Sequence, residues 1–69
     1  MLQTGKYKHY KGNEYELIGI AKFSGTLEEM VIYRALYGEN LLWVRPLLEF
    51  TSEVEVCGKK RPRFEYIGV

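Results

Sequence analysis

The clearest structural signal of the chain lies in residues 30–45, MVIYRALYGENLLWVR. Met30 to Tyr37 is rich in Val, Ile and Tyr, which favour β-strands. Gly38-Glu39-Asn40 follows, and both Gly and Asn tolerate the backbone conformations that tight turns require. Leu41 to Arg45 is then expected to return as a second strand. These residues predict an antiparallel hairpin at the centre of the fold.

Two further strands are expected before this hairpin. Lys6 to Tyr10 is the first, and a turn at Lys11-Gly12-Asn13 leads into the second, which runs from Glu14 to about Phe23. The alternation of apolar residues changes phase near Gly19, which predicts a β-bulge or a sharp bend in this strand.

One or two helical turns are expected between the strands. Thr26 and Glu29 have the spacing of a capping box, which predicts one turn of helix in the connection before the central hairpin. Pro46 should end the second hairpin strand, because it cannot donate a ladder hydrogen bond. Leu47 to Thr51 is then expected to form a helical turn, with Phe50 pointing inward.

The rest of the chain completes a single small β-domain over residues 1–69. Glu53 to Cys57 is predicted to be a short strand or an extended loop, Gly58 to Pro62 a basic loop, and Arg63 to Ile67 the last strand. Turn signals about every ten residues favour a meander of short strands. We therefore predict an all-β fold, a small half-open, SH3-like barrel of five or six strands with one or two helical turns.

Composition limits the environment in which the chain is expected to work. A hydrophobic content of 46% is ample for a folded domain. Cys57 is the only cysteine, so no internal disulfide can form, and no apolar stretch approaches the roughly 20 residues that span a bilayer. The first residues do not have the pattern of a signal peptide. We expect a protein of the reducing cytoplasm, without a membrane span.

Charge is segregated along the chain although the net charge is only +1. Residues 1–13 carry +3, residues 14–56 carry −5, and residues 57–69 carry +3. The basic ends could form one patch if the termini lie close together, as they often do in small domains. The alternative is that both ends are simply solvated.

Side-chain parity in the central hairpin predicts a binding surface. Leu42 and Val44 share one face of their strand and are expected to fill the core, which would leave Trp43 and Arg45 facing outward. The alternative is that Trp43 and the tyrosines are core residues, because a domain this small needs its largest side chains inside. The candidate ligand-binding residues are Tyr33, Tyr37, Trp43, Arg45, Arg63, Lys59, Lys60, Arg61 and His9.

Both faces of the Met30–Tyr37 strand are apolar, so its outer face should be covered. The Pro46–Phe50 turn or a partner could provide that cover. The sequence shows no catalytic motif and no metal-binding motif, since the single histidine, His9, has no ligand-spaced neighbours. We expect no cofactor and no enzymatic activity. The alternative is an enzyme with a polar pocket near His9, Tyr10 and Arg45.

The aromatic and basic residues predict a binding module for an anionic ligand such as single-stranded nucleic acid or a nucleotide. Bases would stack on Trp43 or Tyr37, while Arg45, Arg63 and the cations of residues 59–61 would neutralise phosphate. The alternative is a protein-interaction module that uses a peptide groove, strand augmentation or homodimerisation.

Four segments, in this order, resemble a short bacterial family catalogued as domain of unknown function 1653. They are His9–Asn13 (HYKGN), Val31–Gly38 (VIYRALYG), Leu42–Pro46 (LWVRP) and Pro62–Phe64 (PRF). The resemblance covers roughly residues 5–67, and it implies a compact bacterial domain without an assigned activity. The chain departs from the family pattern at Gly25, where the family usually has an acidic residue.

Overall fold

The central hairpin forms where the sequence predicts it. In the computed structural model, which describes residues 2–68, β3 (Glu29–Ala35) pairs antiparallel with β4 (Leu42–Pro46), and Tyr33 lies opposite Trp43. The second strand ends one residue later than expected, and the first ends two residues earlier. Tyr37 consequently lies in the connecting loop.

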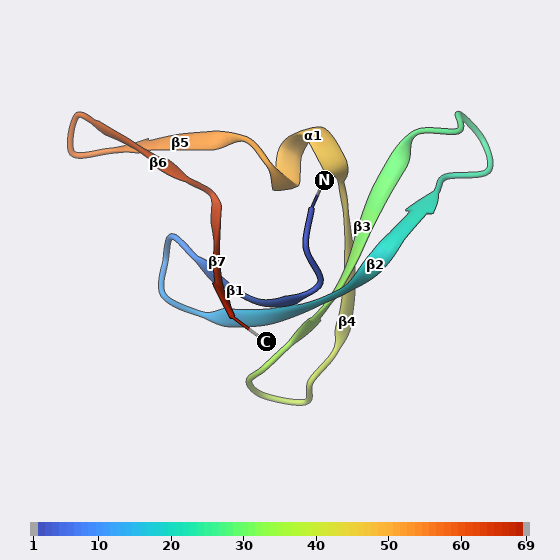
Figure 1. Ribbon diagram of the computed structural model, residues 1–69, viewed down its shortest axis with the longest axis horizontal. Coiled ribbons are helices and arrows are strands. Elements are labelled where there is room, and N and C mark those ends of the chain that lie inside the picture. The colour runs from blue at the N-terminus through green and yellow to red at the C-terminus, as the bar shows by residue number, and fades with distance from the viewer. Residues whose placement is uncertain (1, 69) are drawn as a thin grey trace.

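Seven strands and one short helix make up the described chain (Figure 1). The other elements are β1 (Gly5–His9), β2 (Glu14–Lys22), α1 (Leu47–Phe50), β5 (Glu53–Val56), β6 (Lys59–Pro62) and β7 (Phe64–Gly68). The main sheet has the strand order β4-β3-β2-β1-β7, and β5 and β6 form a separate two-stranded sheet. No helix within residues 2–68 is long and apolar enough to cross a membrane.

The main sheet bends into a trough, and α1 lies over its open side (Figure 1). The strands at its two ends, β4 and β7, do not pair with each other, so the sheet stays open and does not close into a barrel. The predicted mainly-β domain is confirmed, with seven strands where five or six were expected. We call the side of the sheet that faces α1 the inner face.

The bulge predicted near Gly19 is present in β2. Leu17 pairs with Tyr33 and Gly19 with Ile32, which leaves Ile18 as an extra residue in the ladder. A single extra residue reverses the alternation of side chains between the two faces. The apolar positions of β2 therefore change parity at this point.

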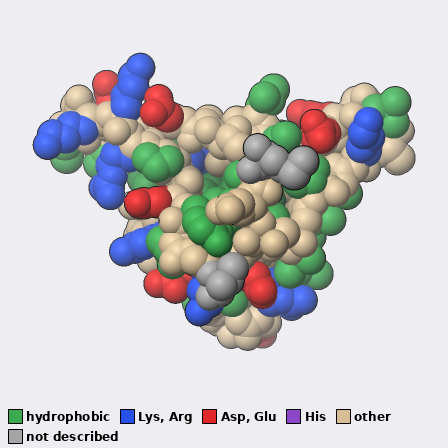
Figure 2. Space-filling model, viewed as in Figure 1, with side chains coloured by type: hydrophobic (Ala, Val, Ile, Leu, Met, Phe, Trp, Pro, Cys, Tyr) green, Lys and Arg blue, Asp and Glu red, His purple; other side chains and the backbone are tan. Residues whose placement is uncertain are grey.

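Lysines of the N-terminal segment are matched by glutamates on the neighbouring strand. Lys6 lies opposite Glu16, and Lys8 lies opposite Glu14, in the β1–β2 ladder. Figure 2 shows other basic side chains gathered around the β5–β6 end of the molecule, with acidic side chains among them. Charges of opposite sign are therefore mixed on this side of the molecule.

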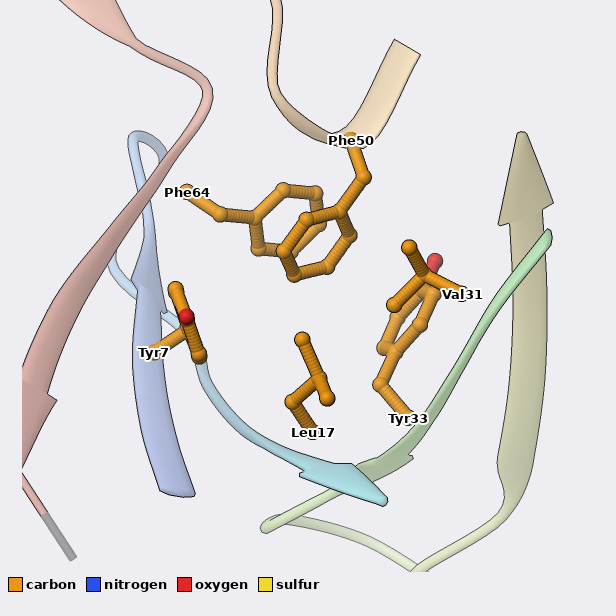
Figure 3. Packing of buried hydrophobic residues seen from close by; sticks show 6 residues of the cluster. All are labelled: Tyr7, Leu17, Val31, Tyr33, Phe50 and Phe64. Carbon is orange, nitrogen blue, oxygen red and sulfur yellow. The ribbon is translucent and has the colours of Figure 1, made fainter. Parts of the chain in front are cut away.

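The core is small and mainly aromatic. Phe50 is almost fully buried, and its ring stacks on Phe64 with centroids 4.1 Å apart and planes 7° from parallel. The inward position predicted for Phe50 is confirmed, and α1 closes the core from above (Figure 3). The buried cluster consists of Tyr7, Leu17, Val31, Tyr33, Phe50 and Phe64.

The helical turn predicted from Thr26 and Glu29 is wrong. The connection is a non-helical turn in which the Glu28 backbone N–H donates to Thr26 Oγ1 at 3.2 Å. Leu27 has a φ of 62°, which lies in the left-handed region and is incompatible with a right-handed helix. A threonine that accepts from a nearby backbone N–H forms such a turn as readily as a helix cap.

The basic loop predicted over Gly58–Pro62 is also wrong, because Lys59–Pro62 forms strand β6. Cys57 and Gly58 have φ values of 53° and 78°. Positive φ at both central residues is the geometry of the two-residue turns that match the twist of a hairpin. Cys57 is the unexpected residue at this turn, since asparagine or glycine is usual there.

Candidate functional site

Trp43 and Arg45 project from the inner face of β4. Trp43 lies directly opposite Tyr33, a buried core residue, and opposed residues share a face. Leu42 and Val44 lie on the outer face, where they are 56% and 59% exposed. The prediction that this aliphatic pair fills the core is wrong. The reason is that β4 is an edge strand and aromatic side chains from other elements already fill the interior.

The Pro46–Phe50 turn is not the cover of the outer face of β3, which was one of the two predicted alternatives. α1 packs through Phe50 against the inner-face residue Tyr33, with ring centroids 5.5 Å apart. The Pro46–Phe50 turn therefore covers the inner face, and a partner on the outer face of β3 stays a prediction.

Arg45 is held by three contacts. Its Nε donates to the Tyr33 hydroxyl at 3.3 Å, and its Nη1 donates to the Glu49 carboxylate at 2.6 Å. The guanidinium carbon lies 5.5 Å from the centre of the Phe64 ring. Burial lowers the pKa of Arg45. The Tyr33 hydroxyl and the Glu49 carboxylate together raise it by more than burial lowers it, so the net shift of the pKa is upward. The side chain therefore stays charged, and these two hydrogen bonds use only two of its five N–H groups.

His9 also packs on the Phe64 ring that Arg45 approaches. The His9 and Phe64 rings meet edge to face with centroids 4.8 Å apart. The Lys11 backbone N–H donates to His9 Nδ1 at 3.2 Å. A neutral ring in this arrangement carries its proton on Nε2, which is then the atom that can donate to a ligand.

The surroundings of His9 are positively charged. Its pKa is lowered first by burial and then by the charges of Arg45, Lys11 and Arg63. All of these effects disfavour the protonated ring in the free protein. An anion bound among the same side chains would have the opposite effect.

Arg63 is fixed by the segment that follows α1. Its Nε donates to Ser52 Oγ at 3.1 Å, and its backbone N–H donates to the Ser52 carbonyl at 3.0 Å. The Arg63 carbonyl accepts from the Tyr10 backbone N–H at 3.0 Å. These bonds hold Arg63 between β1 and α1, within electrostatic range of His9.

Tyr15 is a central residue of this region that is missing from the predicted ligand-binding residues. Its hydroxyl shares a 2.8 Å hydrogen bond with that of Tyr37, and its ring packs edge to face on Tyr33 and Phe64. Burial, followed by the hydrogen bond with Tyr37, raises the pKa of Tyr15 to about 12. Its alternation with the apolar Leu17 in β2 was the signal that could have placed it on the inner face.

The cations of β6 are not part of the same cluster. The β5–β6 hairpin extends from the main sheet on the side away from β4 (Figure 1). Lys60 lies opposite Glu55 in the hairpin ladder, and Lys59 lies next to the turn. The structure therefore separates Lys59 and Lys60 from Trp43.

Arg61 instead borders a small polar cleft of about 220 Å³ next to His9, together with Lys8 and Lys11. A wider groove of about 820 Å³ lies elsewhere, between the start of the chain and α1, and is mostly apolar, with Leu17 and Leu47 in its wall. The positive charges thus gather at the polar cleft and not at the wider groove.

We name the inner-face group of His9, Tyr33, Trp43, Arg45 and Arg63 the Arg45 surface. Trp43 remains 48% exposed on it, whereas Tyr33 is buried beneath it and contributes its hydroxyl to Arg45. The surface therefore combines an accessible indole with fixed cations, next to the Tyr15–Tyr37 pair. Among residues 2–68, no group of three His, Cys, Asp or Glu side chains is arranged to hold a metal ion.

Fold and site together define a small, mainly β domain with an aromatic and basic inner rim. The model of the family described as protein of unknown function (DUF1653) matches residues 5–66, so the chain belongs to this family. A crystal structure of a protein belonging to DUF1653 from Bordetella bronchiseptica is similar, with a TM-score of 0.90 and 33% identity. The match covers 97% of this chain and 88% of that one. No curated protein matches the sequence.

Proposed function

We propose that the protein is a non-enzymatic binding module whose Arg45 surface binds an anionic ligand with a flat aromatic group. Single-stranded nucleic acid and nucleotides have this chemistry. The observation that carries the proposal is the arrangement of a half-exposed Trp43 and a hydrogen-bonded Arg45 on one face of β4. Stacking on the indole and ion pairing with the guanidinium would then engage two parts of one ligand.

Preorganisation of Arg45 supports an anion as the ligand. The contacts with Tyr33 and Glu49 hold the guanidinium in place, so little rotamer entropy remains to be lost on binding. Arginine presents a planar fork that matches the oxygens of a phosphate group. Glu49 is an exposed partner, and a phosphate could share Arg45 with it or displace it.

His9 and Arg63 provide additional charge for the same anion. Both side chains are fixed by hydrogen bonds to neighbouring segments, and both lie in the electrostatic neighbourhood that includes Arg45. A protonated His9 next to a bound phosphate would be stabilised by it. The expected affinity therefore rises as pH falls through the pKa of His9, and it decreases as salt screens the charges.

An NMR titration tests the proposal. We expect adenosine monophosphate and an oligothymidylate, added separately to the full chain at low salt, to cause saturable shifts at the Trp43 indole and at His9. The two probes distinguish a site for one nucleotide from a site for a strand. Arg45→Gln should weaken binding by a factor on the order of ten or more, because a charge-assisted hydrogen bond is lost.

Arg34→Gln is the matched control, because it removes the same charge from the neighbouring strand. The Arg34 Nη1 donates to the Asn40 carbonyl, and the residue lies opposite Leu42, on the outer face. Binding should survive this change. Equal losses in the two variants would mean nonspecific attraction, and an absence of saturable shifts with both probes would reject the proposal. Thermal unfolding of each variant establishes that it is folded.

A further inference from the structure

We propose that the free edge of β4 pairs antiparallel with β4 of a second copy of the chain, with Trp43 at the two-fold axis. This inference does not rest on the ligand-binding proposal, although the Trp43 side chain takes part in both. It starts from the position of β4 at the end of the main sheet, where one side of its backbone has no neighbouring strand among the described residues.

The first three residues of β4, Leu42 to Val44, lack the features that usually prevent strands from pairing, whereas the charge of Arg45 and the proline Pro46 stand only at its end. Residues 41–44 are Leu-Leu-Trp-Val, and all four are exposed. No charge or proline interrupts them, and the register between β3 and β4 is continuous, without a bulge. Soluble proteins normally protect an edge with lysine, proline or a bulge, because an exposed apolar edge recruits other strands.

The backbone of β4 shows which groups face outward. The Ala35 N–H donates to the Leu41 carbonyl at 2.9 Å, so this opposed pair is of the hydrogen-bonded type. Pair types alternate along an antiparallel ladder. Trp43 therefore directs its N–H and C=O toward β3, whereas Leu42 and Val44 direct theirs away from the sheet. Pro46 has no backbone N–H, and its position in the alternation is one whose backbone groups point away from β3. This is the expected position for a proline in an edge strand.

These outward groups are complementary to themselves. If Trp43 lies opposite Trp43 of the second copy, Leu42 lies opposite the second Val44, and the two resulting pairs exchange four backbone hydrogen bonds. Each outward N–H and C=O of Leu42 and Val44 is then satisfied. A register centred on Val44 would instead place Pro46 opposite Leu42, and each such pair would lack the donor for one hydrogen bond.

Side chains and charges agree with the same register. The two Trp43 indoles would meet at a closely spaced, non-hydrogen-bonded position, where aromatic pairs are favourable. Each Arg45 would face Leu41 of the other copy, and the two arginines would be roughly 13 Å apart along the strands. Like charges are therefore not opposed.

Pairing would also extend the apolar strip on the outer face. Val44 lies opposite Ile32 in the β3–β4 ladder, and Ile18 occupies the bulge next to Ile32 in β2. Leu42 of the second copy would continue this strip on the other side of Val44. The two Arg45 surfaces would then lie on the same side of a continuous ten-stranded sheet, on either side of the axis.

The test is the mass of the full chain in solution without ligand, measured by sedimentation equilibrium over a series of concentrations. We expect reversible dimerisation. Val44→Lys places a charge on the pairing edge and should give a monomer. Ile18→Lys is the matched control, because Ile18 is similarly exposed, at 47%, on the outer face but away from the edge, and it should retain the dimer.

Amide hydrogen exchange provides a second readout that is specific to the register. The amides of Leu42 and Val44 should be protected in the wild-type dimer, and the Leu42 amide should exchange rapidly in the Val44→Lys variant. A wild-type chain that stays monomeric would overturn the proposal. A dimer that persists in Val44→Lys, or a wild-type dimer that leaves the Leu42 amide unprotected, would also overturn it.

Discussion

At the scale of single residues, Tyr15 links the core to the Arg45 surface. Its ring packs on the core residues Tyr33 and Phe64, while its hydroxyl reaches Tyr37 in the loop after β3. The pKa of Tyr15 is raised to about 12 in the folded chain, from an ordinary tyrosine value of 10.0. The unfolded chain therefore loses this proton at lower pH than the folded chain.

This difference predicts a pH-dependent stability. The contribution of Tyr15 is fully present below pH 10 and is lost as pH rises through about 12, because the unfolded state releases its proton first. Urea unfolding at a series of alkaline pH values measures the effect. Tyr15→Phe should reduce the loss of stability at alkaline pH. Tyr10→Phe changes a tyrosine outside the hydrogen-bonded pair and should leave that loss unchanged. If the free energy of unfolding falls equally with pH in the wild type and in Tyr15→Phe, Tyr15 is not the cause of the pH dependence.

Residue-level prediction from sequence succeeded where a side chain had only one plausible environment. Phe50 follows Pro46 in a short turn, and its inward position was foreseen. Parity alone could not decide between the faces of β4, because both Leu42–Val44 and Trp43–Arg45 are suitable for a core. The outcome depends on β4 being an edge strand, and strand order is a property of the whole sheet.

At the scale of elements, Gly5 allows β1 and β7 to approach closely. Gly5 has a φ of 133°, and a Cβ at this position would lie 2.7 Å from the Gly68 carbonyl oxygen and 3.1 Å from the Tyr66 ring. Gly5 opens β1 next to the register shift between Lys6 and Tyr7 in the β1–β7 ladder. Any larger residue would strain the backbone and push these strands apart.

We therefore expect Gly5→Ala to lower the free energy of unfolding by about 1–3 kcal/mol, measured by chemical denaturation. Gly19→Ala is the matched control. Gly19 also lies in the main sheet, but a Cβ added there would meet no atom of the described chain within 4 Å, and its φ is not positive. Its replacement should have little effect. Comparable losses in the two variants would show that the close approach at Gly5 is not the cause.

Elements defined by local sequence were largely foreseen, including the bulge near Gly19 and the turn that carries Phe50. Strand β6 was missed because its basic, proline-containing sequence, KKRP, lacks the apolar alternation of a half-buried strand. All of its residues are exposed, so no core face imposed a pattern on it. Its pairing depends on the turn at Cys57 and Gly58, where cysteine gives no hairpin signal.

At the scale of the whole molecule, the trough brings together residues that are far apart in the sequence. His9 comes from β1, Arg45 from β4, and Phe64, which contacts both, from β7. Their individual types suggested a site, but their proximity depends on strand order and on the curvature of the sheet. The separate β5–β6 hairpin extends away from β4 and keeps Lys59 and Lys60 apart from Trp43, which the linear charge pattern could not indicate.

The Arg45 surface makes His9 a reporter of any bound anion. In the free protein, burial and the charges of Arg45, Lys11 and Arg63 hold the pKa of His9 below its ordinary value. A phosphate bound among these cations would stabilise the protonated ring, so binding must raise that pKa. The same linkage requires binding to strengthen as pH falls.

The most direct test of the account is an NMR pH titration of the His9 ring protons, without ligand and with saturating adenosine monophosphate or oligothymidylate. We predict a pKa below the usual histidine value in the free protein and an upward shift with the bound probe. A His9 pKa that stays the same when either probe is fully bound would place the ligand elsewhere and contradict the account.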